Sequence, residues 1–338
     1  MGTVGIGVVG LGRMGRIYAF HVARQVEGAR LVAVADPLPE ATQAVTDQID
    51  GVRGFSDYHD LLASPEVQGV IVATPTSTHH DIVIAAAEAG KAIFCEKPTA
   101  LTLAANDAMA AAVARAGVLY QVGFMRRFDK GFVAARRQIE AGVIGAPVVI
   151  RSISRDPYRT SLEFADPARS GGLIVDMCIH DFDVARWLMG DEVARVYAEA
   201  GVLVYPELAE VGDVDNVMIC VRFARGGLGN VEASRNARYG YDIQCEVLGS
   251  EGALRVGYLR ETPVLTLTRA GVTHDVVPYF MERFGPAYTA QIEHFVACVR
   301  EDAPPRVGPE DARAALQVSL AATRSQHEGR PVEVSEVG

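Results

Sequence analysis

The sequence has no long apolar run, and this absence argues against membrane-spanning and secreted proteins. No stretch of the 338 residues approaches the roughly 20 apolar residues that a membrane-spanning helix needs. The N-terminus lacks the basic segment, the apolar stretch and the cleavage site of a secretory signal. We therefore expect a cytoplasmic protein that has no membrane partner.

Paired cysteines and basic runs are missing too. The five cysteines are far apart and none forms a Cys-x-x-Cys pair, so we expect neither a disulfide framework nor a metal site; they are Cys95, Cys178, Cys220, Cys245 and Cys298. A formal net charge of −10 would repel a phosphate backbone, and no basic run is interleaved with aromatic residues. Nucleic acid is therefore excluded as an expected partner.

The composition is that of a chain that can form ordinary hydrophobic cores. The hydrophobic fraction is 49% and the charged fraction is 22%, which is close to the average of globular proteins. Because a single core stops growing at about 250–300 residues, a chain of this length is expected to form two domains.

The first third alternates short β-branched runs with helical patterns. Strands are predicted at Val4–Val9, Leu31–Ala35, Val70–Ala73, Ala92–Cys95 and Val118–Val122. Helices are predicted at Arg13–Val26, Pro39–Ile49, Thr78–Ala89 and Leu103–Ala116. Near-continuous apolar strands separated by helices are typical of buried parallel strands. The pattern predicts an α/β fold with an N-terminal Rossmann domain, a doubly wound parallel sheet.

After a helix predicted over Phe128–Ala141, the pattern changes. One helix, roughly Met177–Met189, is followed by runs of alternating character that glycine-containing turns separate, which favours antiparallel hairpins. Two helices and a short strand close the chain, at Ala287–Arg300, Pro309–His327 and Pro331–Val334. We expect a first domain over 1–123. Residues 124–338 should form an α+β domain on a large, mostly antiparallel sheet, with the C-terminal helices packing back on the first domain.

A glycine pattern follows the first predicted strand and opens the first predicted helix. It reads Gly10-Leu11-Gly12-Arg13-Met14-Gly15. Gly10 permits the tight turn, Gly12 lets the backbone approach a pyrophosphate, and Gly15 lets the helix pack closely on the strand. The helix N-terminus offers N–H groups to the anion. An ordinary glycine-rich turn is the alternative. The context predicts a dinucleotide site with Arg13 and Met14 in its turn.

Further residues lie in two turns that follow the carboxyl ends of predicted strands, where ligands bind in this class of sheet. Asp36 comes 21 residues after Gly15, where a carboxylate accepts hydrogen bonds from a ribose and repels a 2′-phosphate. That favours NAD over NADP, although an Asx turn with Pro37 is also compatible. Thr74 and Pro75 form the next such turn and His79 begins the helix after it, although any helix-capping loop has this character.

Three residues further along the chain suit catalysis. Lys97 comes directly after a predicted strand, in Glu96-Lys97-Pro98, where it can hydrogen-bond both a substrate hydroxyl and a cofactor; a solvated surface lysine is the alternative. Asp176 and His180 are four residues apart at the start of the helix predicted in the second domain. That spacing suits a carboxylate that orients an imidazole base, or merely an N-terminal cap beside a helix histidine.

These segments together resemble the glucose-fructose oxidoreductase/inositol dehydrogenase (Gfo/Idh/MocA) superfamily over nearly the whole chain. Its most specific pieces are the glycine turn, Phe94–Pro98, Val122–Asp129, Asp176–Asp183 and Tyr239–Glu246. The resemblance implies a catalytic trio of Lys97, Asp176 and His180, with Glu96 and Lys97 on the cofactor side. It also implies a substrate pocket that Met125, Arg126, Asp156 and Tyr239 complete. Assembly as a homotetramer is implied as well.

The expected reaction is NAD-dependent oxidation of a secondary hydroxyl of a cyclic polyol, of the myo- or scyllo-inositol type. His180 would act as general base, Asp176 would orient it, and Lys97 would position the hydroxyl. The chain departs from the family's pattern at Ser154–Ser161, on the substrate side. A hexose or another sugar is an alternative substrate. Redox-neutral, NAD-dependent glycoside hydrolysis and cofactor sensing without turnover are alternatives from other classes.

Overall fold

The computed structural model describes residues 2–338 and divides into two compact units. Unit 1 comprises Met1–Met125 and Pro286–Arg313, and unit 2 comprises Arg126–Gly285 and Ala314–Gly338. No helix within residues 2–338 is both long enough and apolar enough to cross a membrane.

Unit 1 is built on a six-stranded sheet in the order β3-β2-β1-β4-β5-β6. Its strands are β1 (Val4–Val9), β2 (Ala29–Ala35), β3 (Arg53–Phe55), β4 (Gly69–Val72), β5 (Ala92–Cys95) and β6 (Tyr120–Val122). Every neighbouring pair is parallel. The predicted doubly wound parallel sheet is confirmed, and β3 is an additional strand at its edge.

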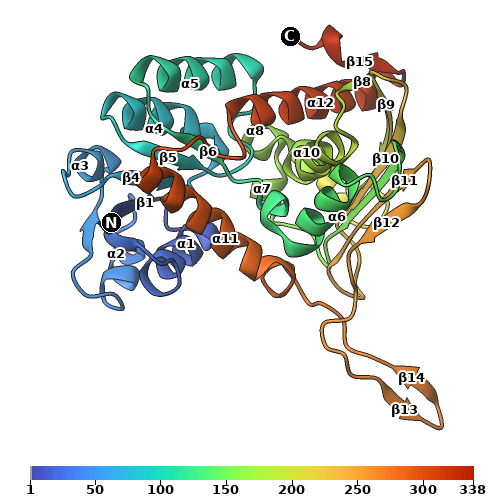
Figure 1. The fold of residues 1–338 in the computed structure, drawn as a ribbon, viewed down its shortest axis with the longest axis horizontal. Coiled ribbons are helices and arrows are strands. Elements are labelled where there is room, and N and C mark those ends of the chain that lie inside the picture. The colour runs from blue at the N-terminus through green and yellow to red at the C-terminus, as the bar shows by residue number, and fades with distance from the viewer. Residues whose placement is uncertain (1) are drawn as a thin grey trace. The chain divides into compact units, whose positions relative to one another are not determined.

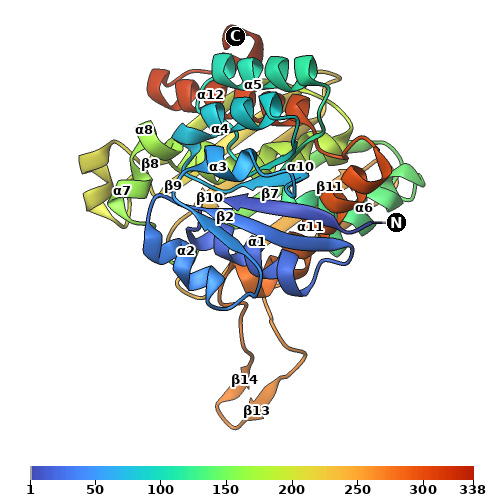
Figure 2. The same cartoon turned by 90° about the vertical axis from the view of Figure 1, so that its left-hand side faces the viewer.

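Helices cover both faces of this sheet (Figures 1 and 2). They are α1 (Arg13–Arg24), α2 (Pro39–Thr46), α3 (Tyr58–Leu62), α4 (Thr76–Glu88) and α5 (Leu103–Ala116). Helices α1 and α2 lie on one face, and α4 and α5 on the other. The strand order reverses between β1 and β4, and the carboxyl ends of strands at such a point are where ligands bind.

A late segment of the chain completes unit 1. Helix α11 spans Phe280–Glu301, and its part from Pro286 onward belongs to this unit. The ring centroid of Phe295 lies 6.0 Å from that of Phe94 on β5, and that of Tyr288 lies 6.3 Å from that of Tyr18 on α1. The helix begins earlier than the sequence predicts, with Pro286 inside it.

Unit 2 is built on a seven-stranded sheet in the order β12-β11-β7-β10-β9-β8-β15. Its strands are β7 (Pro147–Arg155), β8 (Val193–Gly201), β9 (Asn216–Phe223), β10 (Leu228–Ser234), β11 (Asp242–Gly249), β12 (Ala253–Val256) and β15 (Val332–Glu333). Only the β10–β7 pair is parallel among the neighbours described. The predicted α+β domain with a mostly antiparallel sheet is confirmed.

The helices of unit 2 correct one prediction. They are α6 (Lys130–Glu140), α7 (Leu162–Ala165), α8 (Pro167–Ser170), α9 (Gly172–Asp176), α10 (Cys178–Met189) and the greater part of α12 (Pro309–Glu328). Three 3₁₀ turns accompany them along the chain, at Met125–Phe128, Pro206–Val211 and Val334–Glu336. The helix predicted over Met177–Met189 corresponds to α10, but the expectation of a single helix in this region is wrong, because the short helices α7, α8 and α9 precede it. Helix α9 ends at Asp176 and α10 starts at Cys178, with Met177 between them.

A hairpin of β13 (Thr266–Thr268) and β14 (Gly271–Thr273) extends away from the large sheet of unit 2 (Figures 1 and 2). The turn at Ala270-Gly271 is one of the glycine-containing turns of this region. Its apolar side chains face solvent, with Leu267 74% and Val272 60% exposed.

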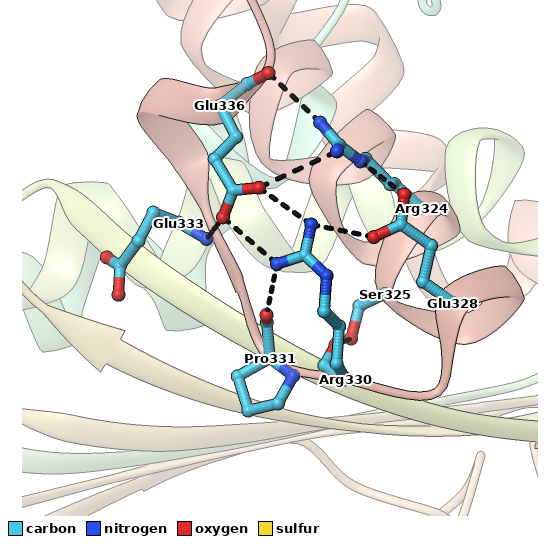
Figure 3. Close-up of polar contacts among 7 residues, drawn as sticks. All are labelled: Arg324, Ser325, Glu328, Arg330, Pro331, Glu333 and Glu336. Atoms are coloured by element: carbon cyan, nitrogen blue, oxygen red, sulfur yellow. Dashed lines mark hydrogen bonds and ion pairs between the residues drawn. The ribbon is translucent and has the colours of Figure 1, made fainter.

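The C-terminus is fastened to unit 2 by a cluster of charged residues, shown in Figure 3. The Arg330 guanidinium lies 2.7 Å from carboxylate oxygens of both Glu328, at the end of α12, and Glu336. Arg324 on α12 lies 2.7 Å from Glu328 and 3.6 Å from Glu336. The hydrogen bond from Arg330 lowers the pKa of Glu336 to about 2. The cluster links α12 with the last residues of the chain.

Candidate active-site residues

The glycine turn of unit 1 has the geometry that an anion site requires. Gly10 adopts a φ of +86°, and a Cβ at Gly15 would lie 1.7 Å from the Gly10 carbonyl oxygen, so a side chain does not fit at either position. A Cβ at Gly12 would meet nothing within 4 Å, so the backbone there is open to approach. No side chain caps the N-terminus of α1, which leaves its first N–H groups available to a pyrophosphate.

The other residues predicted near this turn lie beside it. The side-chain methyl of Thr74 is 2.6 Å from the position of a Gly10 Cβ. Pro75 caps α4, directly after Thr74. On the first turn of α1, Arg13 is exposed and Met14 is half-buried. Unit 1 therefore brings the predicted cofactor residues together at the β1 and β4 strand ends.

Asp36 forms the Asx turn that its position suggested and also binds the glycine turn. Its Oδ1 accepts a hydrogen bond from the backbone N–H of Leu38 at 2.9 Å, which is the Asx turn. Its Oδ2 accepts one from the N–H of Leu11 at 2.7 Å, which ties the end of β2 to the glycine turn. Each carboxylate oxygen has a further lone pair for a ligand hydroxyl.

His79 is enclosed by backbone carbonyls. Its Nε2 lies 2.9 Å from the carbonyl oxygen of Thr74, and its Nδ1 lies 3.0 Å from that of Pro98. Burial lowers the pKa of His79, which is only 1% exposed. The imidazole therefore links the turn after β4 to the turn after β5, where Lys97 lies.

Glu96, at the end of β5, is part of a buried network in unit 1. Its Oε1 accepts a hydrogen bond from the Tyr18 hydroxyl, and its Oε2 accepts one from the backbone N–H of Lys97 at 3.0 Å. The amide of Gln291 donates to the Tyr18 hydroxyl at 2.8 Å. Burial raises the pKa of Glu96, and the Tyr18 hydrogen bond opposes that effect. Because both carboxylate oxygens accept from the protein, Glu96 fixes the backbone of half-buried Lys97.

In unit 2, the two other members of the trio flank the break between α9 and α10. Asp176 is the last residue of α9 and is half-buried, whereas His180 lies in the first turn of α10 and is 8% exposed. The His180 N–H donates to the carbonyl of Met177 at 3.3 Å. The break therefore sets the backbone on which both side chains are mounted.

Arg126 is anchored inside unit 2. Its Nη1 donates to Asp181 Oδ1 at 2.7 Å, and its Nη2 donates to the Ser154 hydroxyl at 2.9 Å. Ser152 and Ser154 also donate to the Asp181 carboxylate, at 2.6 and 2.8 Å. Asp181 lies within the Asp176–Asp183 segment of the family resemblance, and the structure makes it the buried partner of Arg126. A sign of this was available, since the two serines occupy alternate positions of β7 and so share one face.

The remaining predicted pocket residues of unit 2 lie at neighbouring strand ends. Half-buried Asp156 follows β7, and its carbonyl accepts from the N–H of Ala237 at 2.9 Å. The Tyr239 hydroxyl donates to Asp242 at 2.8 Å and accepts from Arg155 at 2.9 Å. Burial is the largest cause of the raised pKa of Tyr239. Met125, the last residue of the first segment of unit 1, is buried.

No group of three or more His, Cys, Asp and Glu side chains within residues 2–338 has the arrangement of a metal site.

Two profiles of one protein family match the chain. Residues 4–124 match the profile described as "Oxidoreductase family, NAD-binding Rossmann fold". Residues 136–334 match "Oxidoreductase family, C-terminal alpha/beta domain". The first description agrees with the glycine turn, the open α1 N-terminus and Asp36, which together fit the pyrophosphate and the ribose of NAD.

Similar proteins extend over almost the full length. The chain is 41% identical over 327 residues to scyllo-inositol 2-dehydrogenase (NAD(+)) of Bacillus subtilis, covering 97% of this chain and 95% of the relative. It is 39% identical to myo-inositol 2-dehydrogenase of Thermotoga maritima, covering 98% and 99%. A crystal structure of scyllo-inositol dehydrogenase from Lactobacillus casei with bound NAD(H) and scyllo-inositol matches with a TM-score of 0.94 at 30% identity, covering 98% and 99%.

Proposed function

This chain belongs to the oxidoreductase family with an NAD-binding Rossmann domain, and from that membership we propose that it oxidises one ring hydroxyl of an inositol to a ketone. The observation that carries the proposal is the near full-length similarity to relatives named as scyllo- and myo-inositol 2-dehydrogenases. It is supported by the presence of Lys97, Asp176 and His180, the trio that the sequence resemblance implies.

The proposed reaction divides the work among these side chains. NAD, when bound, accepts the hydride from the carbon that carries the hydroxyl. His180 takes the hydroxyl proton on an imidazole nitrogen, which suits a side chain whose ordinary pKa is about 6.5. Asp176 orients the imidazole and stabilises its charge, and the ammonium of Lys97 holds the hydroxyl and polarises the forming ketone.

The same proposal assigns the binding residues. Residues 1–123 would bind NAD, and 124–338 would bind the polyol and mediate assembly into a homotetramer in the cytoplasm. Besides the trio, the polyol would contact Met125, Arg126, Asp156 and Tyr239. Arg126 is held in place for that role by its hydrogen bonds to Asp181 and Ser154.

The experiment that tests the function is to follow NADH absorbance while the purified protein is offered NAD with single candidate substrates. The panel contains myo-inositol, scyllo-inositol, other inositols, and hexoses of both hands. We expect NADH to form with at least one inositol at a higher kcat/KM than with any hexose. NADH formation with hexoses alone would move the assignment to a sugar dehydrogenase. Cleavage of a glycoside without net NADH would move it to hydrolysis.

Cofactor preference gives a separate prediction. Replacing Asp36 with serine removes the negative charge that would face a 2′-phosphate, together with the carboxylate oxygen that accepts from the Leu11 N–H. Because like-charge contacts cost several kcal/mol, we expect the ratio of kcat/KM for NADP to that for NAD to rise by at least about tenfold, or about 1.4 kcal/mol. Asp50→Ser, at an exposed position, is the control. A ratio that stays the same in initial-rate measurements would rule out this role for Asp36.

A further inference from the structure

Unit 2 contains a buried arginine between two carboxylates, and one of these is Asp176. Arg235 follows strand β10 and is 2% exposed. Its Nη1 donates a hydrogen bond of 2.6 Å to Asp213 Oδ2. Its Nη2 lies 3.7 Å from Asp176 Oδ2. The guanidinium is therefore hydrogen-bonded to one carboxylate and close to the other.

Asp213 also binds the start of the helix that ends at Asp176. Its Oδ1 accepts a hydrogen bond of 2.8 Å from the backbone N–H of Leu173, the second residue of α9. A Cβ at Gly172 would lie 2.7 Å from that same oxygen, and the φ of Gly172 is +70°, so the approach requires glycine. Asp213 thus accepts a hydrogen bond from the beginning of α9. Through Arg235, Asp213 is also linked to Asp176 at the end of α9.

The arginine itself is mounted on rigid backbone. Its N–H donates to the carbonyl of Asp215 at 3.0 Å. The Asp215 carboxylate in turn accepts the backbone N–H groups of residues 203–205 at 2.7–2.8 Å. These hydrogen bonds lower the pKa of Asp215. The backbone of Arg235 is therefore held by Asp215, and its guanidinium is held by Asp213.

The contact between Arg235 and Asp176 is an ion pair without a hydrogen bond. The distance of 3.7 Å is about 0.8 Å longer than an ordinary N–H···O hydrogen bond. Nη2 is nevertheless buried and has no hydrogen-bond partner among residues 2–338. A buried guanidinium hydrogen without an acceptor is costly, so the Asp176 carboxylate is the group that this nitrogen attracts.

We propose that Arg235, held by Asp213, is a positioning residue that fixes the direction of the Asp176 carboxylate. The inference deepens the proposed function, on which it rests, because Asp176 there orients the base His180. Arg235 need not touch the polyol or NAD for this role. It acts by restricting the positions that the Asp176 carboxylate can take relative to the groups that it contacts.

A purely structural ion pair must be distinguished from this role, so the test uses charge-balanced variants. Arg235→Met together with Asp213→Asn removes one charge of each sign, keeps an acceptor for the Leu173 N–H, and leaves the half-buried Asp176 carboxylate without its arginine. Arg235→Lys keeps the charge but loses the second nitrogen. The matched control is Arg283→Met with Asp129→Asn, a similarly buried pair at 2.9 Å elsewhere in unit 2.

In the intact enzyme with NAD and its best inositol, we expect the Arg235/Asp213 double variant to lose about 10- to 100-fold in kcat, the range typical of residues that orient functional ligands. The dissociation constant for NADH, from its fluorescence, should not change. Arg235→Lys should recover part of the loss. The control pair should reduce the melting temperature but not kcat. Equal kcat in the two double variants would overturn the proposal.

A crystal structure of the double variant provides a second test, one that does not depend on turnover. We expect the Asp176 carboxylate to rotate or shift from its wild-type position, while the backbone of α10 stays in place. An Asp176 side chain that keeps its wild-type position would overturn the proposal even if activity fell. If the wild-type protein oxidises no polyol, the proposed function fails, and the position of Asp176 still decides the role of Arg235.

Discussion

Replacing His180 with alanine should lower kcat for polyol oxidation by about 10³-fold, within the 10²–10⁴ range that general base catalysis contributes. The imidazole is 8% exposed in the first turn of α10, and alanine keeps that helix. The proton of the substrate hydroxyl would then have to pass to water. Steady-state kinetics should show the loss in kcat, and NADH fluorescence should show unchanged cofactor binding.

An exposed histidine provides the control for this variant. His59 on α3 pairs with Asp57 at the surface of unit 1, so His59→Ala should leave kcat unchanged. If His180→Ala retained near-normal kcat over the whole pH range, His180 would not be the base. Loss of NADH binding in the same variant would indicate a binding or folding role instead.

Replacing Lys97 with methionine should lower kcat by about 10²- to 10³-fold, the usual effect of removing one donor that stabilises charge in a transition state. Methionine keeps an apolar stem of similar length, and the backbone N–H that donates to Glu96 remains. The expected defect is therefore chemical, and the melting temperature should stay close to that of the wild type. Steady-state kinetics with the best substrate of the panel would measure the loss in kcat.

Another lysine in unit 1 serves as the matched control. The Lys91 ammonium donates to the backbone carbonyls of Ser64 and Val67, at 3.0 and 2.8 Å. Lys91→Met should therefore reduce stability and leave kcat intact, the reverse of the pattern expected for Lys97. If Lys97→Met lost stability and kept kcat, Lys97 would have no part in catalysis.

The parallel sheet could be predicted because its central strands are short apolar runs that stay buried on both faces. Strand β3 escaped prediction for the opposite reason. It is a three-residue edge strand whose Arg53 and Gly54 are exposed, so no apolar run marks it. The sequence predicts the start of α11 too late, at Ala287, because a proline inside a helix removes a backbone hydrogen bond and usually marks a helix boundary. In the structure, Pro286 lies inside the helix.

Site residues that directly follow a predicted strand could be predicted from the sequence, whereas partners that are far apart along the chain could not. Asp36 could be chosen because it follows β2 at the spacing of a dinucleotide fold. Arg235 and Asp213 are 59 and 37 residues from Asp176 along the chain, and neither belongs to a motif. Only the fold of unit 2 brings the three together. In unit 1, Glu96 and Gln291 are likewise far apart along the chain, and Tyr18 links them by hydrogen bonds.

The last strand of the chain has a consequence for handling the protein. Strand β15 contributes only two residues, yet Val332 is fully buried and pairs with Val196 at the open side of β8. Without it, β8 would lose its pairing at Arg195 and Val196 and leave free N–H and C=O groups there, the kind of surface that promotes aggregation. A purification tag is therefore safer at the N-terminus, and deletion of the last ten residues should turn a well-behaved preparation into a precipitating one.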